Sequence, residues 1–579
     1  MSKVLYLDTI SDVKTVDENI KRFSSLNQSV VKHFRNLSDL IIYLCDVGSS
    51  DLDLDYPSVF IINEHTLTNR SRVLHEGIQK TPLNILPYDE IYELLKHHYK
   101  HFNPLIYKLN EFSITKINKV IDDYHKVLKN RILRMKSWTG LNNENTKKCP
   151  CLHSMTNCLN TILQKDYQIS NKLINYVSLI NQDIDFFKIL SLPKPLEYYL
   201  YCIGNWGFIA QELTCDITYC AFQIFKISFG IIKDNDSLLL KDNEIFSFLF
   251  SLRDSYRGGN NFHNFRHAVD VLQATFYFLL SIEALPKFPY YTNDYQIHPR
   301  DQMNSNYKYQ GKQDYNHDNS LLHPIQTLAL LVSSIGHDVG HPGLTNPFLI
   351  NNESPIAKIY SNQSVLEHYH LTIFQDILSF HWPSFLKNEF TNEKDSPLNT
   401  KTMQIESILA TDMANHFEYL HKINQVSELL ENPEQRPLIK DSLKHTNVIL
   451  SLIIKCADIS NVSRPLFIST KWAVVLGREF SEIAQLENNL NKGISVDELD
   501  DPRLGPHFPI TVKEAVDNNP SLPKGQLFFI NTFAEALFKE VCTVLPELKF
   551  SSELVQKNKQ FWENVESDSI DLSTVGEYI

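Results

Sequence analysis

The sequence predicts a mainly α-helical protein with a smaller N-terminal region of α/β type. Past Pro195, apolar side chains recur with helical spacing almost to the end of the chain. In residues 1–110, short runs of apolar and β-branched residues alternate with helical stretches instead. The chain has 579 residues, 43% of them hydrophobic, which is enough to form more than one buried core.

Residues 1–110 are expected to form a small α/β module. Its predicted strands are the apolar runs at 4–7, 40–45 and 59–62. Asp8 and Asp46 follow the first two runs, an arrangement that faintly resembles receiver-type phosphoacceptor folds. We favour the alternative, in which these carboxylates end loops and carry no chemistry.

Residues 111–195 are expected to form a helical linker region. The pattern turns helical at Ile106, where a long, amphipathic, lysine-rich helix is predicted to run to Met135, and residues 140–160 are polar and exposed in character. The nine cysteines are an odd number and scattered, which favours reduced thiols. A zinc cluster of Cys149, Cys151, His153 and Cys158 is the alternative, but its spacing fits no familiar zinc finger.

Residues 196–565 are expected to form one large helical domain. Residues 289–322 interrupt it with polar side chains and almost no aliphatic ones, and are predicted to be a disordered insertion. Residues 566–579 form an acidic tail. The predicted helices span 209–231, 263–285, 324–340, 364–381, 401–422, 441–459, 468–488 and 524–544.

The formal net charge of −13 argues against binding to nucleic acid or anionic membranes, because both require basic patches. The apolar run at the N-terminus is too short for a signal peptide. No stretch of about 18 apolar residues predicts a membrane span. We therefore expect a cytoplasmic protein, and no dense basic cluster decides whether it also enters the nucleus. An acidic protein that acts on an anionic substrate needs local positive charge, which bound metal ions would supply.

Three separated segments carry the residues that bear most directly on function. The first, Phe262–Val271, contains His263 and His267, which share one face if this segment is helical. One of these histidines can bind a metal ion, while the other, nearer the mouth of a site, can donate a proton.

The second segment follows an apolar helix ending at Gly336 and contains His337, Asp338 and His341. Neighbouring side chains on a helix point about 100° apart, so His337 and Asp338 can reach one ion only near a helix end or kink. Gly336 and Gly340 loosen the backbone as this requires.

The third segment is a buried apolar helix that ends at Asp458. A carboxylate in such a position is costly unless it is paired or bound to metal. His267, His337, Asp338 and Asp458 together form a mixed nitrogen and oxygen set that suits a divalent cation, zinc in particular. A metal hydroxide formed there could attack phosphorus, and Asp338 could bridge two metal ions.

In these three segments the chain resembles the class I cyclic-nucleotide phosphodiesterases. That family has Tyr-His-Asn-x-x-His-Ala-x-Asp-Val, His-Asp-x-x-His-Pro-Gly and Cys-Ala-Asp-x-Ser-Asn. The resemblance covers about residues 200–565 in order, and is closest to the fungal high-affinity cyclic-AMP members. It implies an all-helical HD-type phosphodiesterase catalytic domain over residues 196–565.

The resemblance also implies roles for individual residues. His267, His337, Asp338 and Asp458 would hold Zn²⁺, and Asp338 would also bind a second ion, Mg²⁺ or Mn²⁺. His341, Glu367 and Thr411 would support the water shell of that ion, and His263 would be the general acid. Gln526 would hydrogen-bond the purine, Phe529 and Leu476 would enclose its ring, and Asn461 and Trp472 are weaker candidates for the same pocket.

The chain departs from the family pattern in three places. Phe262 replaces the usual Tyr, Gly340 stands where many members have Asp, and His368 and Tyr369 alter the family's Glu-Asn-His-His segment. None of these changes removes a predicted metal ligand or the predicted acid.

The predicted activity is hydrolysis of 3′,5′-cyclic AMP to 5′-AMP, which would lower cyclic-AMP signalling, with cyclic GMP as another candidate substrate. One alternative is a different HD-type nucleotide phosphohydrolase, which would not need His263, Gln526 and Phe529 in these positions. Another is a catalytically weak protein that binds cyclic nucleotides as a regulator. The distinct composition of residues 1–170 suggests a role in self-association or regulation, and the sequence leaves the oligomeric state open.

Overall fold

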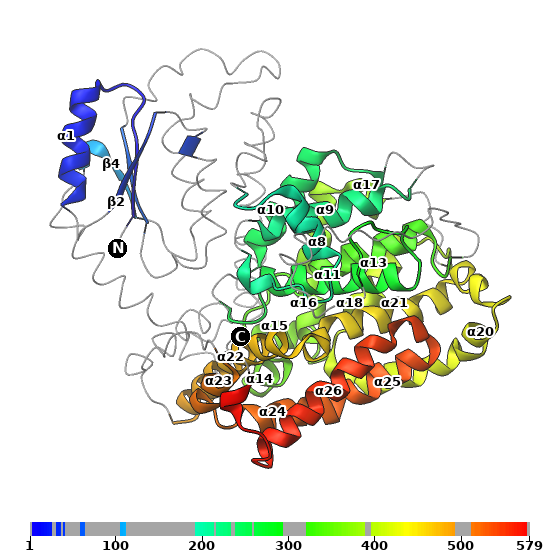
Figure 1. Ribbon diagram of the computed structural model, residues 1–579. Helices are drawn as coiled ribbons and strands as arrows, with labels where there is room; N and C mark the ends of the chain where they lie inside the picture. The colour runs from blue at the N-terminus through cyan, green and yellow to red at the C-terminus, as the bar shows by residue number, and fades with distance from the viewer. Residues whose placement is uncertain are drawn as a thin grey trace. The chain divides into compact units, whose positions relative to one another are not determined.

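The computed structural model describes residues 3–25, 30–35, 39–40, 58–63, 105–111, 192–213, 216–232, 238–256, 260–292, 320–387, 395–492 and 511–575. The chain divides into two compact units (Figure 1). The first comprises residues 1–191 with 253–255 and 488–501. The second comprises residues 192–252, 256–487 and 502–579.

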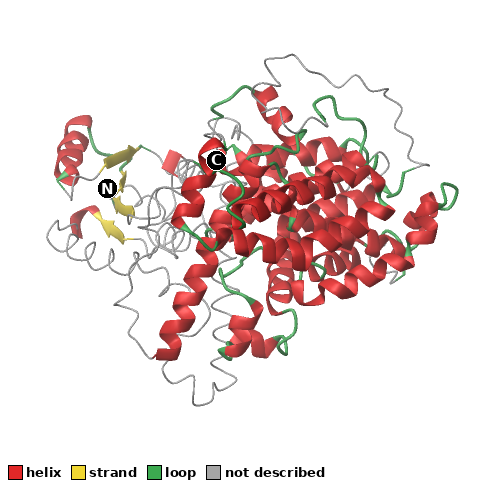
Figure 2. Ribbon diagram, turned by 60° about the horizontal axis from the view of Figure 1, so that its bottom comes forward, coloured by secondary structure: helices red, strands yellow, loops and turns green. Residues whose placement is uncertain are grey.

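The first unit contains a parallel sheet in the order β2-β1-β3-β4. The strands are β1 (Lys3–Leu7), β2 (Val30–Phe34), β3 (Ser58–Ile62) and β4 (Leu105–Lys108), and helix α1 (Val13–Ser24) follows β1. All four strands that the structure describes lie in this unit (Figure 2). One buried apolar cluster of this unit comprises Val4, Tyr6, Val16, Phe23, Val59 and Ile61. The α/β character predicted for the N-terminal region is confirmed.

Two predictions for this region need comment. The runs at 4–7 and 59–62 form β1 and β3, but most of the run at 40–45 lies outside the described residues. The helix predicted from Ile106 is wrong at its start, because Leu105–Lys108 pairs with β3 as strand β4. An apolar stretch of four residues suits either structure, and here pairing with a buried neighbouring strand decides. Leu109–Glu111 forms a 3-10 turn after the strand. The rest of that predicted helix and the four-residue zinc cluster lie outside the described residues.

Asp8 stands at the carboxyl end of β1 and is buried. Its carboxylate accepts hydrogen bonds from the Tyr6 hydroxyl, from the backbone N–H groups of Ile10 and Ser11, and from Asn63 Nδ2. Burial alone would raise the pKa of Asp8, but these donors outweigh it and lower the pKa to about 2. The hydrogen bonds of the carboxylate thus join the loop after β1 to Asn63, the residue that follows β3.

The second unit is helical, and four of its helices pack against one another at its centre: α11 (Phe265–Ser281), α13 (Pro324–Gly336), α18 (Thr400–Leu409) and α21 (Leu443–Asp458) (Figure 1). The others are α8 (Leu196–Ile203), α9 (Ile217–Phe229), α10 (Asp242–Ser255), α14 (Asn346–Asn351), α15 (Pro355–Ile359), α16 (Val365–His381), α17 (Pro383–Leu386), α19 (His416–Lys422), α20 (Ser427–Glu431), α22 (Leu466–Lys492), α23 (Val512–Asn518), α24 (Leu522–Phe529), α25 (Glu535–Val544) and α26 (Lys549–Glu566). The predicted helical fold class is confirmed.

The predicted helices are right in kind but differ in their ends. The helix predicted at 401–422 is broken between α18 and α19 by a short 3-10 turn at Met413–Asn415. The helix predicted at 524–544 contains a π-helical turn at Ile530–Ala534. Within the described residues, no helix is long and apolar enough to cross a membrane.

A buried ion pair fixes α11 relative to the segment that follows α21. Arg464 Nη2 lies 3.1 Å from Asp270 Oδ1, and both side chains are almost completely buried. The guanidinium also lies 4.2 Å from the centre of the Trp206 ring, and its Nη1 donates to the Trp206 carbonyl. Because the two charges pair and the Arg464 guanidinium also donates to the carbonyls of Trp206 and Asp270, the pair ties the helix that bears His267 to the chain beyond Asp458.

We predict that Asp8→Ala destabilises the N-terminal unit by about 2–3 kcal/mol, because the Asn63 amide and the Tyr6 hydroxyl lose a charged partner. Since the pKa of Asp8 is lowered in the folded chain, its contribution is present at neutral pH and is lost as the pH falls from about 4 toward 2. Hydrogen exchange at the amides of Leu5 and Ile61 measures the effect. The exposed Asp17→Ala is the control, and unchanged protection in Asp8→Ala would contradict the assignment.

Candidate active site

The four predicted metal ligands come from the ends of three central helices. His267 lies in the first turn of α11, which Asn264 caps by accepting hydrogen bonds from the N–H groups of Arg266 and His267. His337 and Asp338 follow the last residue of α13, and Asp458 is the last residue of α21. Helix ends free the backbone to turn, so the adjacent His337 and Asp338 can face one point, as their spacing predicts.

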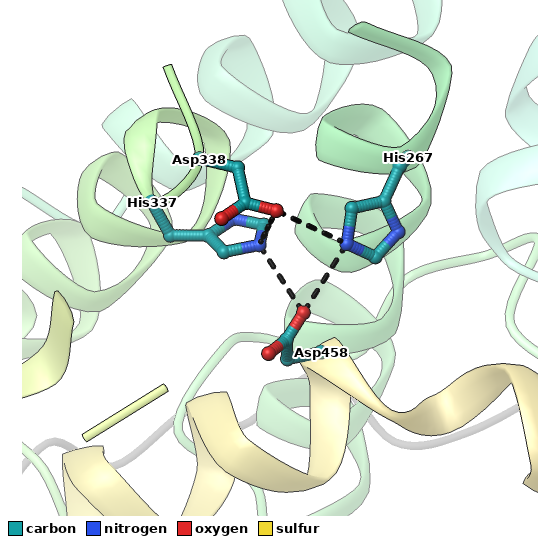
Figure 3. Close-up of side chains that lie close together, drawn as sticks. All are labelled: His267, His337, Asp338 and Asp458. Carbon is teal, nitrogen blue, oxygen red and sulfur yellow. Dashed lines mark hydrogen bonds and ion pairs between the residues drawn. The ribbon is translucent and has the colours of Figure 1, made fainter. Parts of the chain in front are cut away.

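The four side chains converge, and their ligand atoms all lie within 4.8 Å of one another (Figure 3). Asp458 Oδ1 lies 3.2 Å from both His267 Nε2 and His337 Nε2. Asp338 Oδ2 lies 3.2 Å from His337 Nε2 and 3.6 Å from His267 Nε2. Ligands of a tetrahedral zinc ion stand about 3.4 Å apart, given metal–ligand distances near 2.1 Å. The spacing of the cluster therefore fits a divalent ion at its centre.

The hydrogen bonds around His337 also fit a metal ion. His337 Nδ1 lies 2.8 Å from the Ser334 carbonyl, which makes Nδ1 the donor and leaves the Nε2 lone pair facing the cluster. Nε2 is buried with two carboxylate oxygens 3.2 Å away, but among the described residues none is in hydrogen-bonding geometry with it. Burial alone would lower the pKa of His337, but the carboxylates of Asp338 and Asp458 raise it well above its usual value. The cluster thus favours positive charge at this point.

Two glycines shape the backbone beside His337. A side chain at Gly336 would place its Cβ 2.3 Å from Phe374 Cζ. Gly340 has a φ of +78°, and a Cβ there would lie 2.4 Å from Ile373 Cδ1. The glycines thus permit close packing of the turn against α16, a reason more specific than the loosened backbone that the sequence suggested.

The spacing of His263 and His267 predicted that His263 lies on the same helix, which is wrong. His263 lies two residues before α11 begins. Its position is set by Glu479 of α22, which accepts hydrogen bonds from the N–H groups of Phe262 and His263 and lies 2.5 Å from His263 Nδ1. Burial lowers the pKa of His263, but the Glu479 carboxylate outweighs it, and the net effect is a pKa raised to about 9. The His263 ring also stacks on His341 with centroids 3.9 Å apart.

The residues predicted to support a second ion lie around Asp338. His341 Nδ1 accepts a hydrogen bond from the Gly343 N–H, and burial holds the pKa of His341 well below its usual value. Glu367 accepts from Asn346 Nδ2, and burial together with Asp412 raises the pKa of Glu367 to about 7. Thr411 Oγ1 donates to the Ile408 carbonyl.

These groups open onto a cavity of about 1340 Å³. His263, Asp338, His341, Glu367, Thr411 and Asp458 line it, and so do Leu476, Gln526 and Phe529 of the predicted base site. Gln526 Oε1 is buried without a hydrogen-bond partner among the described residues, so it is available to a ligand. Asn461 is buried but is not among the lining residues. Trp472 is not among them either, and packs against Phe262 and His267.

The cavity carries an unusual balance of charge. Its lining includes five carboxylates, those of Asp338, Glu367, Asp412, Asp458 and Glu479, and no lysine or arginine among the described residues. An anionic ligand would be repelled by this wall unless cations were bound at it.

The sequence analysis assigns no role to Glu479 or His370, two residues that lie near the cluster. His370 Nδ1 lies 2.8 Å from the Val339 carbonyl and Nε2 lies 3.6 Å from Asp338 Oδ1. The sequence does contain a signal for His370. It follows Glu367 by three residues, and residues three apart share one face of a helix, so both can face the site.

Comparison with known proteins agrees with this geometry. The family model described as 3′,5′-cyclic nucleotide phosphodiesterase matches residues 262–555. The chain belongs to this family. The match includes every residue of the cluster, together with His263 and the lining residues Gln526 and Phe529.

Several known proteins are similar to this chain. The 3′,5′-cyclic-nucleotide phosphodiesterase 2 of Saccharomyces cerevisiae is 34% identical over 66% of this chain and 64% of its own length. A cGMP-specific phosphodiesterase of Dictyostelium discoideum is 32% identical over 60% of each chain. The match therefore spans less than two thirds of these relatives. The crystal structure of yeast caPDE2 is similar with a TM-score of 0.72, 33% identity, and coverage of 98% of this chain and 100% of that one.

We predict that Asp458→Ala weakens the binding of a divalent metal ion at the cluster. The variant loses one charged ligand of four, so its content of divalent metal after dialysis should fall to roughly a tenth of the wild-type content. Elemental analysis of the purified chain measures this. Asp376→Ala, which removes an exposed acid from α16, is the control, and full retention of metal by Asp458→Ala would contradict the assignment.

Proposed function

We propose that this protein hydrolyses the 3′ ester of 3′,5′-cyclic AMP to give 5′-AMP. The observation that carries the proposal is the convergence of His267, His337, Asp338 and Asp458 beneath a cavity that has five carboxylates and no lysine or arginine among its described lining residues. Family membership makes a cyclic nucleotide the expected substrate class.

We further propose that Zn²⁺ occupies the four-residue cluster, because two imidazoles and two carboxylates match its ligand preference. A second ion, Mg²⁺ or Mn²⁺, would bind Asp338 and otherwise mostly water held by His341, Glu367 and Thr411. Bound divalent ions lower the pKa of coordinated water and withdraw charge from phosphoryl oxygens.

The protein's own groups would supply the remaining steps. His263 Nδ1 donates to Glu479, so Nε2 is left to protonate the departing 3′-oxygen. Gln526 would pair with the purine edge, and Phe529 and Leu476 would cover the faces of its ring. The nucleotide would thus lie with its phosphate near the cluster and its base near α24.

Substrate choice within the family has to be measured. Relatives of this chain include the cGMP-specific Dictyostelium protein and Drosophila melanogaster proteins named as cyclic-AMP phosphodiesterases, which are 24% identical. We propose cyclic AMP because the motifs of the chain resemble those of the fungal cyclic-AMP members, and the yeast phosphodiesterase 2 is 34% identical to it.

The decisive experiment incubates the purified chain with cyclic AMP and magnesium and measures the release of 5′-AMP by chromatography. We expect turnover that a chelator abolishes, preference over cyclic GMP, and a loss of roughly 10²–10⁴-fold in His263→Asn with its zinc content unchanged. Release of phosphate from 5′-AMP would favour the nucleotidase alternative. Binding of cyclic AMP without turnover by the zinc-loaded chain would favour the regulatory alternative.

A second prediction concerns pH. His263 must be protonated to donate, and Glu479 raises its pKa to about 9, so activity should persist up to about that pH. In Glu479→Gln the opposing charge is lost, and the alkaline limb of kcat/KM should move to lower pH by roughly 1–3 pH units. Glu482→Gln, on the same helix and bonded to Asn261 instead, is the control. An unmoved limb in Glu479→Gln would remove Glu479 from this role.

A further inference from the structure

Lys455 is a buried cation that the proposed mechanism does not use. It lies on α21, one turn before Asp458, and is only 2% exposed. No carboxylate oxygen lies within 4.0 Å of its Nζ among the described residues. Nζ donates instead to two backbone carbonyls, of Ala410 at 2.7 Å and of Asp412 at 3.5 Å.

The two acceptors flank Thr411, in the segment that follows α18. Thr411 and Asp412 line the cavity, whereas Lys455 is not among the lining residues. The ammonium group therefore holds this segment from behind while its side chains face the site. Tyr419 of α19 encloses the same group, with its ring centroid 5.4 Å from Nζ.

The segment in turn fixes the start of α16. Asp412 Oδ2 accepts a 2.7 Å hydrogen bond from Ser364 Oγ. Ser364 precedes α16 with a left-handed φ of 40°, a conformation that costs free energy for a residue other than glycine and needs surrounding contacts to persist. Glu367 follows in the first turn of α16. A continuous set of hydrogen bonds thus leads from Lys455 through Asp412 to the helix that carries Glu367.

We propose that Lys455 is a positioning residue, which holds Thr411 and Asp412 at the cavity wall beside Glu367 by donating to the carbonyls on either side of Thr411. The inference rests on the proposed function, because Thr411 and Glu367 are there assigned to the second metal ion.

Packing alone does not account for a lysine here. An unpaired buried ammonium is costly, and burial lowers the pKa of Lys455 to about 8. Replacing buried charge by an apolar side chain of similar volume is often neutral or stabilising. A methionine would fill the same space without this cost. The structure therefore points to a role for the hydrogen bonds of the amine, and not only for the volume of the side chain.

The test compares Lys455→Met with wild type once cyclic-AMP turnover by wild type is established, so failure of the proposed function is seen first and separately. We expect kcat at saturating metal and substrate to fall roughly 10- to 100-fold, as for other residues that orient metal ligands, while KM changes less than about threefold. Amide exchange in residues 410–415 should become faster. Lys471→Met is the control, because it removes another buried lysine, which pairs with Glu212. It should change neither kcat nor the amide exchange in residues 410–415.

Lys455→Arg keeps the charge and the donors, and should recover most of kcat and the slow exchange. If Lys455→Met does not fold, Lys455→Arg decides. A folded Lys455→Met chain with wild-type kcat would overturn the proposal. So would a loss of kcat in either variant with unchanged exchange at 410–415, because the lysine would then act through its charge and not through position.

Discussion

The helical unit depends on placing two imidazoles and two carboxylates at one buried point where α11, α13 and α21 begin or end. Such a cluster is unfavourable as bare charge and becomes favourable around a cation. It also requires the ends of three helices to keep fixed positions relative to one another, because all four ligand atoms lie within 4.8 Å of one another. The long apolar faces of these helices, and the buried pair of Arg464 with Asp270, supply that rigidity.

The sequence could predict the ligands because each motif is local and chemically distinctive, and helical periodicity was enough for the fold class. It could not place Glu479 against His263, because 216 residues separate them and only packing of α22 brings them together. The spacing of His263 and His267 fits a helix equally well, so only the cap at Asn264 shows where α11 starts. Likewise, Leu105–Lys108 became a strand through pairing with β3, which no local pattern encodes.

The departures from the family pattern make sense as packing. Tyr369 is fully buried, and a Cβ at position 340 would lie 3.3 Å from its ring and 2.4 Å from Ile373. An aspartate at position 340 would therefore clash with the side chains of Ile373 and Tyr369. Gly340 and Tyr369 are thus two departures from the family pattern that depend on each other. Phe262 similarly packs its ring against His267, with centroids 4.5 Å apart.

Charge balance connects these features. Five acidic side chains line the cavity against one protonated imidazole, that of His263, so bound cations would offset the repulsion that a phosphate ester meets there. Lys455 holds the 410–412 segment from behind this wall, and Glu479 keeps a proton on His263. Binding of a metal ion and protonation of His263 are therefore not independent, since each lowers the free-energy cost of the same set of buried acids.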